Sequence, residues 1–396
     1  MPLPNIDEIT EADLQNLVNN AVLELKTLDY KRILPGNSDG EKKEFLADIV
    51  SFANSMGGDI IYGISENSNH VPTSLDGIEA MDEDGLKLRL DSIIRDGIQP
   101  RIPNIQIRTI PLHTGRIAVI IRIPKSWLNP HMVSFQHSSR FYSRASNGKY
   151  QMDIGEIRSA FSLSESRIQR IKEFVQSRIS DIYSDNAQIQ LTNFPKMSIH
   201  IIPFSSMDTQ IVENFDRLDK ILIFPMFTGN INRTFNTDGY LSYSPESDGV
   251  SKGYVQIYRN GVIEAVSSIF YEGCIQTSLP IYLIENGIIT ALKNYSILLK
   301  VLSVNPPAFV FITLMKVQGL GCPDLEGHFR SEGIPIQKDI IFLPNFELTI
   351  FGSMEEAADF EQFTITLKPT FDALFNSVGL PRSQSYNGQG KWDRPI

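Results

Sequence analysis

Residues 24–66 read ELKTLDYKRILPGNSDGEKKEFLADIVSFANSMGGDIIYGISE. In this segment, stretches rich in apolar residues are separated by short polar stretches. Apolar side chains at helical spacing predict a helix over 41–56, which Gly57 and Gly58 follow as a C-cap signal. The next run, 59–64, is apolar throughout and predicts a buried strand. This fragment therefore predicts a helix and a strand of one α/β core.

The charged residues of the fragment lie where its regular elements end. Glu24, Asp29 and Lys31 precede the helix, and Glu66 follows the strand. A rigid scaffold can hold such groups around a cation or a phosphate. Carboxylates are hard ligands that suit Mg²⁺ or Mn²⁺, and Lys31 would lie on the same side of an extended segment as Asp29. The alternative is three solvated carboxylates, because a chain with 46 acidic residues contains such groupings by chance.

Elements on both sides of this fragment complete a first domain. Thr10 is a candidate N-cap for a helix over 9–20, and a second helix is expected over 85–96. Strands are expected over 105–112, 116–123 and 140–143. The first domain is therefore predicted to be one sheet with helices packed against it.

Charge is unevenly distributed in this domain, although the whole chain carries a formal net charge of -10. Residues 1–85 contain 5 basic and 17 acidic residues, whereas residues 86–158 contain 12 basic and 4 acidic ones. The acidic total argues against a protein that coats nucleic acid indiscriminately. An acidic half beside a basic half suits a nuclease, and two solvated faces are the alternative.

Cations alternate with aromatic residues toward the end of this domain. Arg140, Arg144 and Lys149 lie close to Phe141 and Tyr150. Such a pattern can bind phosphates and stack the bases of a flexible or single-stranded nucleic acid. The alternative is an edge strand with core aromatics and solvated cations.

The rest of the chain predicts a connecting helix and a second mixed domain. Apolar residues at helical spacing predict the connecting helix over 164–185. Asn260-Gly261 predicts a hairpin between two strands. The remaining expected strands are 198–203, 220–224, 253–258, 262–269 and 308–317, and the remaining helices are 280–304 and 368–378. The fold class is thus α/β (α+β), divided into 1–163, 164–188 and 189–396.

Length and composition set the broad class. A chain of 396 residues is long enough for two or three domains. No apolar run reaches the roughly 18 residues of a membrane span, and the N-terminus lacks the layout of a secretion signal. A cytoplasmic protein is expected, with Cys274 and Cys322 as ordinary reduced thiols.

The ordered motifs resemble the AlbA_2 domain of Schlafen proteins and their bacterial relatives. The resemblance covers about residues 10–162 and rests on Glu-x4-Asp-x-Lys from Glu24, then Phe-Ala-Asn, Gly-Gly and Gly-Ile-Ser-Glu. It continues in Pro-His at 130–131, Arg-Phe-Tyr-Ser-Arg at 140–144 and Glu-Ile-Arg at 156–158. This resemblance implies a set of site residues and an activity for the domain.

The resemblance implies Glu24, Asp29 and Glu66 as metal ligands, with Lys31 as the fourth catalytic residue. Much of the family has Glu where this chain has Asp29, and often Asp where it has Glu66. The expected activity is a Mg²⁺- or Mn²⁺-dependent endoribonuclease that cuts structured RNA such as tRNA or rRNA, with DNA as another possible substrate. A role in bacterial antiphage or stress defence is expected.

Animal Schlafens resemble two linked copies of this domain, whereas this chain has one, so a homodimer or higher homo-oligomer is expected. The C-terminal region is assigned to oligomerisation, partner binding or target recognition. A non-catalytic nucleic-acid-binding regulator and a defence-complex subunit are the alternative functions. The chain has no phosphate-binding Gly-x4-Gly-Lys-Ser/Thr motif, no zinc-type histidine spacing and no Gly-x-Ser-x-Gly elbow.

Overall fold

The computed structural model describes residues 3–4, 6–68, 70–79, 82–126, 128–145, 148–207, 215–246, 249–270, 278–304, 306–321, 335–349, 352 and 357–394. Cys274 and Cys322 lie outside the described residues. The chain divides into two compact units, unit 1 over Met1–Ser166 and unit 2 over Arg167–Ile396.

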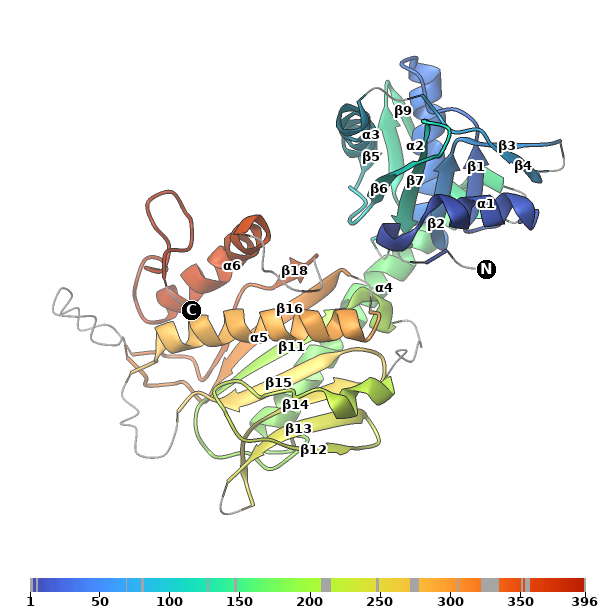
Figure 1. Cartoon of the computed structure of the whole chain (residues 1–396). Helices are drawn as coiled ribbons and strands as arrows, with labels where there is room; N and C mark the ends of the chain where they lie inside the picture. The colour runs from blue at the N-terminus through green and yellow to red at the C-terminus, as the bar shows by residue number, and fades with distance from the viewer. Residues whose placement is uncertain are drawn as a thin grey trace. The chain divides into compact units, whose positions relative to one another are not determined.

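Unit 1 is a mixed α/β fold (Figure 1). Its elements in chain order are η1 (Ile6–Glu8), α1 (Glu11–Asn19), β1 (Leu28–Lys31), α2 (Asp39–Ala53), β2 (Gly57–Tyr62), β3 (Ile64–Glu66), β4 (Pro72–Leu75), α3 (Glu83–Gly97), β5 (Ile98–Gln99), β6 (Gln106–Pro111), β7 (Ile117–Pro124), β8 (Met132–Phe135), β9 (Ser138–Ala145) and β10 (Gly148–Gln151). Helix α4 (Ile154–Tyr183) follows and continues into unit 2.

The central sheet of unit 1 has the strand order β1-β2-β7-β6, and its inner strands β2 and β7 are buried on both faces. Successive side chains of a strand point to opposite faces. Ile60 and Tyr62 therefore pack with α2 and α3, while Ile61 packs with α1. This two-sided burial explains the continuous apolar run of β2, which predicted a buried strand.

Strand β1 lies parallel to β2, with Asp29 opposite Ile60 and Lys31 opposite Tyr62. Leu28 and Tyr30 are buried in the core that contains α1. The alternation of the strand then turns Asp29 and Lys31 toward the α2 side of the sheet. The irregular segment expected from the sequence thus contains a short strand that orients two of the predicted site residues.

Two family motifs serve the architecture of this unit. The amide of Asn54 donates to the carbonyls of His131 and Tyr142 at 2.8 Å each and accepts from the His131 backbone N–H at 2.7 Å. Asn54 therefore joins the end of α2 to the second sheet, whose order is β10-β9-β8-β5. A Cβ on Gly58 would lie 2.4 Å from the carbonyl oxygen of Thr27, so a larger residue would push the chain before β1 away from β2.

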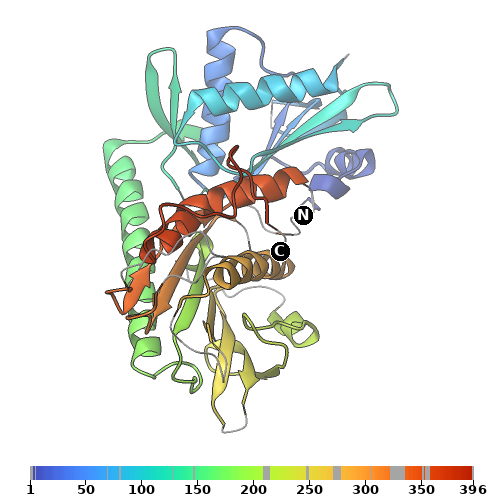
Figure 2. The ribbon, with the colours of Figure 1, turned by 90° about the vertical axis from the view of Figure 1, so that its left-hand side faces the viewer.

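Unit 2 contains one large antiparallel sheet of order β12-β13-β14-β15-β11-β16-β17, with β18 also paired to β16. Its elements are β11 (Lys196–Pro203), η2 (Phe204–Met207), η3 (Phe215–Lys220), β12 (Asn232–Phe235), β13 (Gly239–Pro245), β14 (Ser251–Tyr258), β15 (Ile263–Ser268), α5 (Ile281–Val301), β16 (Ala308–Met315), β17 (Ile340–Phe342), β18 (Phe346–Leu348) and α6 (Ala357–Ser377). Helices α5 and α6 cover one face of this sheet, and α4 covers the other (Figure 2).

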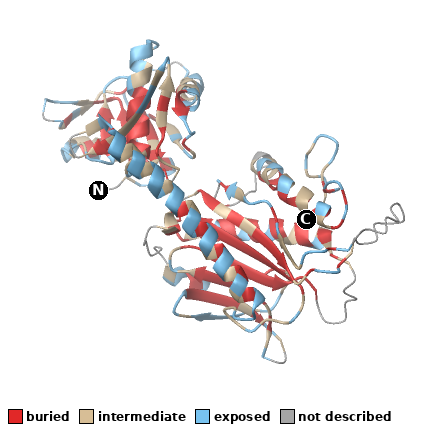
Figure 3. Ribbon diagram, turned by 180° about the vertical axis from the view of Figure 1, so that it is seen from behind, coloured by how far each residue is buried: buried red, intermediate tan, exposed pale blue. Residues whose placement is uncertain are grey.

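Helix α4 is amphipathic along its unit 2 portion. Ile171, Val175, Ile179 and Ile182 are buried against the sheet. The opposite side of the helix is exposed, as the view from behind shows (Figure 3). The connecting helix predicted from residue 164 therefore exists, but it starts ten residues earlier, at Ile154.

The predicted mixed α/β class is confirmed, while two elements of unit 2 differ from expectation. The strand predicted over 220–224 is wrong, because η3 ends at Lys220 and the carbonyl of Ile223 accepts from the Ser242 hydroxyl instead of a strand partner. Helix α6 starts at Ala357 rather than at 368 and continues through Pro369. Buried Phe363, Leu367 and Phe371 explain that continuity, since their spacing is helical.

Trp392 docks the end of the described chain onto unit 2. Its ring centroid lies 5.7 Å from that of Phe371 and 5.4 Å from that of Tyr386. Within the described ranges, none of the helices is both long and apolar enough to cross a lipid bilayer.

Candidate functional site

Glu24 is held against β1 by a turn of the backbone. The N–H of Leu25 donates to the carbonyl of Leu28 at 3.0 Å, and the reverse bond measures 3.2 Å. This turn folds the chain back, so that the Glu24 carboxylate accepts the backbone N–H of Tyr30 at 2.9 Å. The spacing of Glu24 and Asp29 thus reflects one turn followed by the start of a strand.

Glu66 reaches the same place because β2 and β3 are separate strands. The sequence predicted one strand over 59–64, but the chain breaks at Gly63, which has a φ of +98°. A Cβ at Gly63 would lie 3.1 Å from the Cα of Gly77, where the chain that follows β4 passes close by. Glycine is therefore required at this bend, which sends β3 and Glu66 into a hairpin with β4.

The hairpin also supplies a residue that the sequence analysis missed. His70 Nδ1 lies 3.4 Å from an oxygen of Glu24 and 3.4 Å from an oxygen of Glu66. One ligand atom from each of the three residues lies within 4.8 Å of the others. The side chains are 18%, 29% and 67% exposed for Glu24, Glu66 and His70, so the group opens to solvent on the His70 side.

Asp29 lies behind this group and is paired with cations. Its carboxylate contacts Lys31 Nζ at 2.7 Å and Arg144 Nη2 at 3.2 Å, and its side chain is 3% exposed. Burial alone would raise the pKa of Asp29, but the hydrogen bond with Glu24 and the charges of Lys31 and Arg144 lower it overall. Asp29 is therefore an anion inside the protein.

Glu24 has the opposite electrostatic environment. Burial, the hydrogen bond with Asp29 and the charge of Asp29 raise the pKa of Glu24 to about 8, and the charge of Glu66 adds to this effect. A cation between Glu24 and Glu66 would relieve this repulsion. The electrostatics of the site thus favour binding of a positive ion.

A second group of charges lies near Lys31. Asp48 of α2 is buried and contacts Lys149 Nζ at 2.8 Å, and Lys149 also contacts Glu44 at 2.5 Å. Burial raises the pKa of Asp48 in spite of the charges of Lys149 and Lys31. Asp48 lies three residues after Phe45, so a carboxylate on the apolar helix face was the sequence signal for it.

The three predicted nucleic-acid contacts occupy different environments. Arg144 is buried, lies 4.4 Å above the ring of Phe52 and positions Asp29 rather than facing solvent. The side chain of Lys149 is 19% exposed and bound to two carboxylates. Arg140 is exposed and donates to Gln151 at 2.6 Å, so it is the member of this set that a phosphate can reach.

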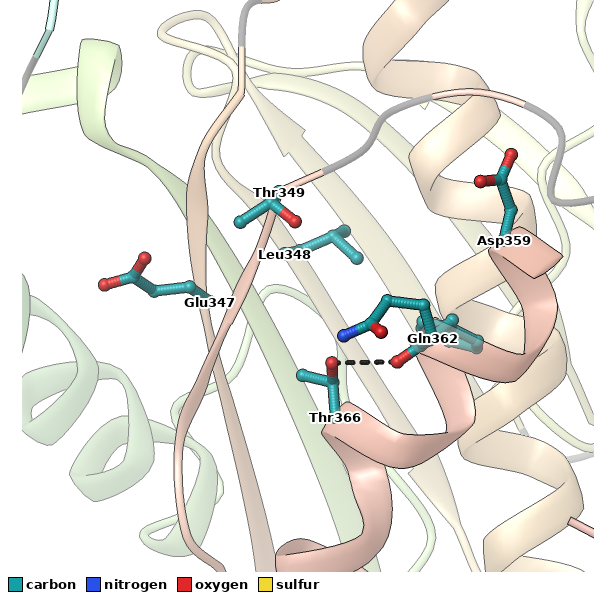
Figure 4. A pocket seen from close by; sticks show the side chains of 7 residues that line it. Glu347, Leu348, Thr349, Asp359, Gln362 and Thr366 are labelled. Atoms are coloured by element: carbon teal, nitrogen blue, oxygen red, sulfur yellow. Dashed lines mark hydrogen bonds between the residues drawn. The ribbon is translucent and has the colours of Figure 1, made fainter. Parts of the chain in front are cut away.

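Two cavities of unit 2 are lined by described residues. The smaller, of about 50 Å³, lies between β18 and α6, and Figure 4 shows the carboxylates of Glu347 and Asp359 on opposite sides of it. The larger, of about 380 Å³, is lined mainly by apolar residues and also by Lys252. Neither cavity shows converging carboxylates among the residues that the structure describes.

The donor set at Glu24, Glu66 and His70 fits a divalent cation. Two carboxylates and one imidazole are common ligands, and three protein ligands leave positions for water or substrate. Lys31 lies beside the group through its bond with Asp29. The arrangement can therefore hold a cation next to a lysine at a surface that a large substrate can approach.

Residues 24–153 match the family described as Schlafen, AlbA_2, and the chain thus contains a Schlafen AlbA_2 domain over this range. The DIP2311 protein from Corynebacterium diphtheriae is similar at 16% identity and a TM-score of 0.24, over 36% of this chain and 26% of that chain. The N-terminal domain of a RecG-related protein from Nitrosomonas europaea is similar at 17% identity and a TM-score of 0.23, over 30% of this chain and 74% of that chain. No curated protein matches this chain.

Proposed function

We propose that the Schlafen AlbA_2 domain of this chain is a divalent-metal-dependent endonuclease that hydrolyses phosphodiester bonds of structured RNA such as tRNA or rRNA. The observation that carries the proposal is the convergence of Glu24 and Glu66 beside the paired Asp29 and Lys31. The resemblance to Schlafen proteins adds the nuclease chemistry. An antiphage or stress-defence role in a bacterial cell is part of this proposal.

Mg²⁺ or Mn²⁺ held by Glu24 and Glu66 would polarise a phosphoryl oxygen and lower the pKa of an attacking water. Lys31 carries a positive charge beside the group and stabilises the negative charge that develops on the phosphate. Asp29 fixes Lys31 through the 2.7 Å contact, and Arg144 fixes Asp29. In the reaction, water adds to phosphorus, one P–O ester bond breaks, and the leaving oxygen takes up a proton.

The test is cleavage of total tRNA, rRNA, and single- and double-stranded DNA with Mn²⁺, Mg²⁺ or EDTA. Glu24→Gln and Glu66→Gln should each reduce the cleavage rate about 100- to 1,000-fold, because metal charge stabilisation contributes several kcal/mol. Glu79→Gln is the matched control, since this exposed carboxylate pairs with Arg116. Cleavage that survives in EDTA or in both variants would end the proposal.

One observation favours a second candidate, a non-catalytic nucleic-acid-binding regulator or defence-complex subunit. Asp29 is already paired with Lys31 and Arg144, so the fold neutralises its charge without a metal ion. RNA binding without cleavage under every metal condition would favour this candidate. A homodimer would combine two copies of the domain in either case, and sedimentation of the full chain tests that expectation.

A further inference from the structure

His70 lies next to both carboxylates of the proposed metal site without a close hydrogen bond to either. Its Nδ1 lies 3.4 Å from Glu24 and 3.4 Å from Glu66. Metal bonds of about 2.1 Å separate neighbouring ligand atoms by about 3.0 Å in octahedral geometry and by about 3.4 Å in tetrahedral geometry. The spacing is therefore that of ligands around one ion, and the third pair of ligand atoms lies within 4.8 Å.

We propose that His70 is a direct nitrogen ligand of the divalent ion held by Glu24 and Glu66, and that it selects Mn²⁺ or another first-row transition ion over Mg²⁺. Mg²⁺ takes oxygen ligands and keeps several waters, whereas imidazole nitrogen suits ions such as Zn, Fe and Ni, and Mn²⁺, which also takes oxygen ligands, begins the transition series that binds mixed nitrogen and oxygen sites. Asp29, which the sequence analysis placed among the ligands, belongs behind this shell, where its oxygens face Lys31 and Arg144. The inference rests on the metal site of the proposed function.

The hairpin turn shows which substitution tests this role. His70 has a φ of +56°, its N–H donates to the carbonyl of Asn67 at 3.0 Å, and the Val71 N–H donates to the Asn67 side chain at 3.2 Å. Asparagine tolerates this left-handed conformation better than most residues. His70→Asn therefore keeps the turn while it replaces the imidazole nitrogen with an amide oxygen.

A matched control exists elsewhere in unit 1. His113 is 79% exposed and its Nδ1 lies 2.6 Å from one oxygen of Glu11. It is thus an exposed histidine paired with a single carboxylate. His113→Asn removes an imidazole from the same unit and leaves the proposed ligands in place.

The experiment titrates the full-length protein with Mn²⁺ and with Mg²⁺ by calorimetry, and records pulsed EPR of the Mn²⁺ complex to detect coupling to histidine ¹⁴N. The wild type and His113→Asn should show the nitrogen coupling and bind Mn²⁺ at least about tenfold more tightly than Mg²⁺. His70→Asn should lose the coupling and bind Mn²⁺ about 10- to 100-fold more weakly. This loss is at least as large as the loss of metal affinity when a residue that hydrogen-bonds to a metal ligand is removed. Its Mg²⁺ affinity should stay within about threefold of the wild type.

Each result separates this inference from the proposed function. Metal binding without nitrogen coupling, or an unchanged Mn²⁺ to Mg²⁺ ratio in His70→Asn, overturns the role of His70 even if RNA is cleaved. If nitrogen coupling is seen but RNA is not cleaved, His70 is supported as a ligand and the proposed nuclease activity is overturned. No binding of either ion overturns both.

Discussion

Glu264 of unit 2 and Glu24 of unit 1 are both carboxylates with little exposure, but their surroundings are opposite. Glu264 of unit 2 accepts from Arg178 at 2.8 and 3.1 Å and from the Tyr254 hydroxyl at 2.7 Å, and lies 3.0 Å from His200 Nε2. Burial alone would raise the pKa of Glu264, yet the bonds with His200 and Arg178 lower it to about 2. Glu24 of unit 1 faces other carboxylates, and its pKa is raised to about 8.

This difference teaches how a structural charge can be distinguished from one that awaits a ligand. The protein's own side chains satisfy both oxygens of Glu264, and its partner Arg178 joins α4 to the sheet. Glu24 and Glu66 share one neighbour, His70, whose Nδ1 lies 3.4 Å from an oxygen of each, and the group is open to solvent on the His70 side. Carboxylates that repel one another at an accessible place favour protonation or binding of an external cation, whereas a neutralised cluster favours neither.

The largest expected effect comes from breaking the satisfied cluster. Glu264→Gln should lower the free energy of unfolding by about 3–5 kcal/mol, because it removes the fully buried charge that Arg178 faces and leaves Arg178 with Asp181 as its carboxylate partner. Glu24→Gln should cause no such loss, since it removes repulsion. Urea denaturation followed by far-UV circular dichroism measures both variants. A loss below about 1 kcal/mol for Glu264→Gln would contradict the structural role of this cluster.

Titration should sharpen the comparison with a smaller effect, because the two carboxylates respond to pH in opposite directions. The folded pKa of Glu264, about 2, lies below the ordinary 4.5, so its stabilisation is present above pH 4.5 and is lost as the pH falls toward 2. The folded pKa of Glu24, about 8, lies above 4.5. The metal-free protein should therefore lose stability as the pH rises from 4.5 to 8, since the unfolded state ionises first.

The measurement is the Tm in EDTA from pH 3 to pH 9. Glu24→Gln should remove the decline above pH 4.5 and melt a few degrees higher than the wild type at pH 8. Glu79→Gln provides the control for an exposed carboxylate. Parallel curves for the wild type and Glu24→Gln between pH 5 and 8 would refute the raised pKa of Glu24.

Sequence patterns predicted much of unit 1 because its elements carry strong periodicity. The helix of residues 41–56 and the buried strand after it exist as α2 and β2, since two-sided burial selects continuous apolar residues. The break at Gly63 was not predicted, because the bend depends on Gly77, a neighbour that only the folded chain brings close. A single glycine in an apolar run is compatible with a strand or with a bend.

The site itself was predictable in part. Glu24 and Glu66 were expected together, and the structure brings both next to His70. The environment of Asp29 was not predictable, because its partner Arg144 comes from β9, more than a hundred residues later. Periodicity reports the face of an element on which a residue lies, but not the charge that a distant strand brings to it.

Arg140 and Arg144 test the comparison within one strand, with the smallest expected effect. Both lie on β9, but Arg140 is exposed while Arg144 is bound to Asp29 inside the protein. If exposed charges bind RNA and internally paired charges do not, Arg140→Gln should weaken RNA binding about two- to threefold. It should also reduce the slope of log affinity against log salt by about 0.7, which is the change expected when one phosphate contact on a single strand is lost. Arg144→Lys keeps a cation beside Asp29 and should leave that slope unchanged. Filter-binding titrations from about 50 to 300 mM salt measure these slopes. An exposed arginine within reach of a phosphate releases counterions when the complex forms, so its loss must change the slope. Equal slopes for Arg140→Gln and the wild type would therefore mean that RNA approaches unit 1 from another side.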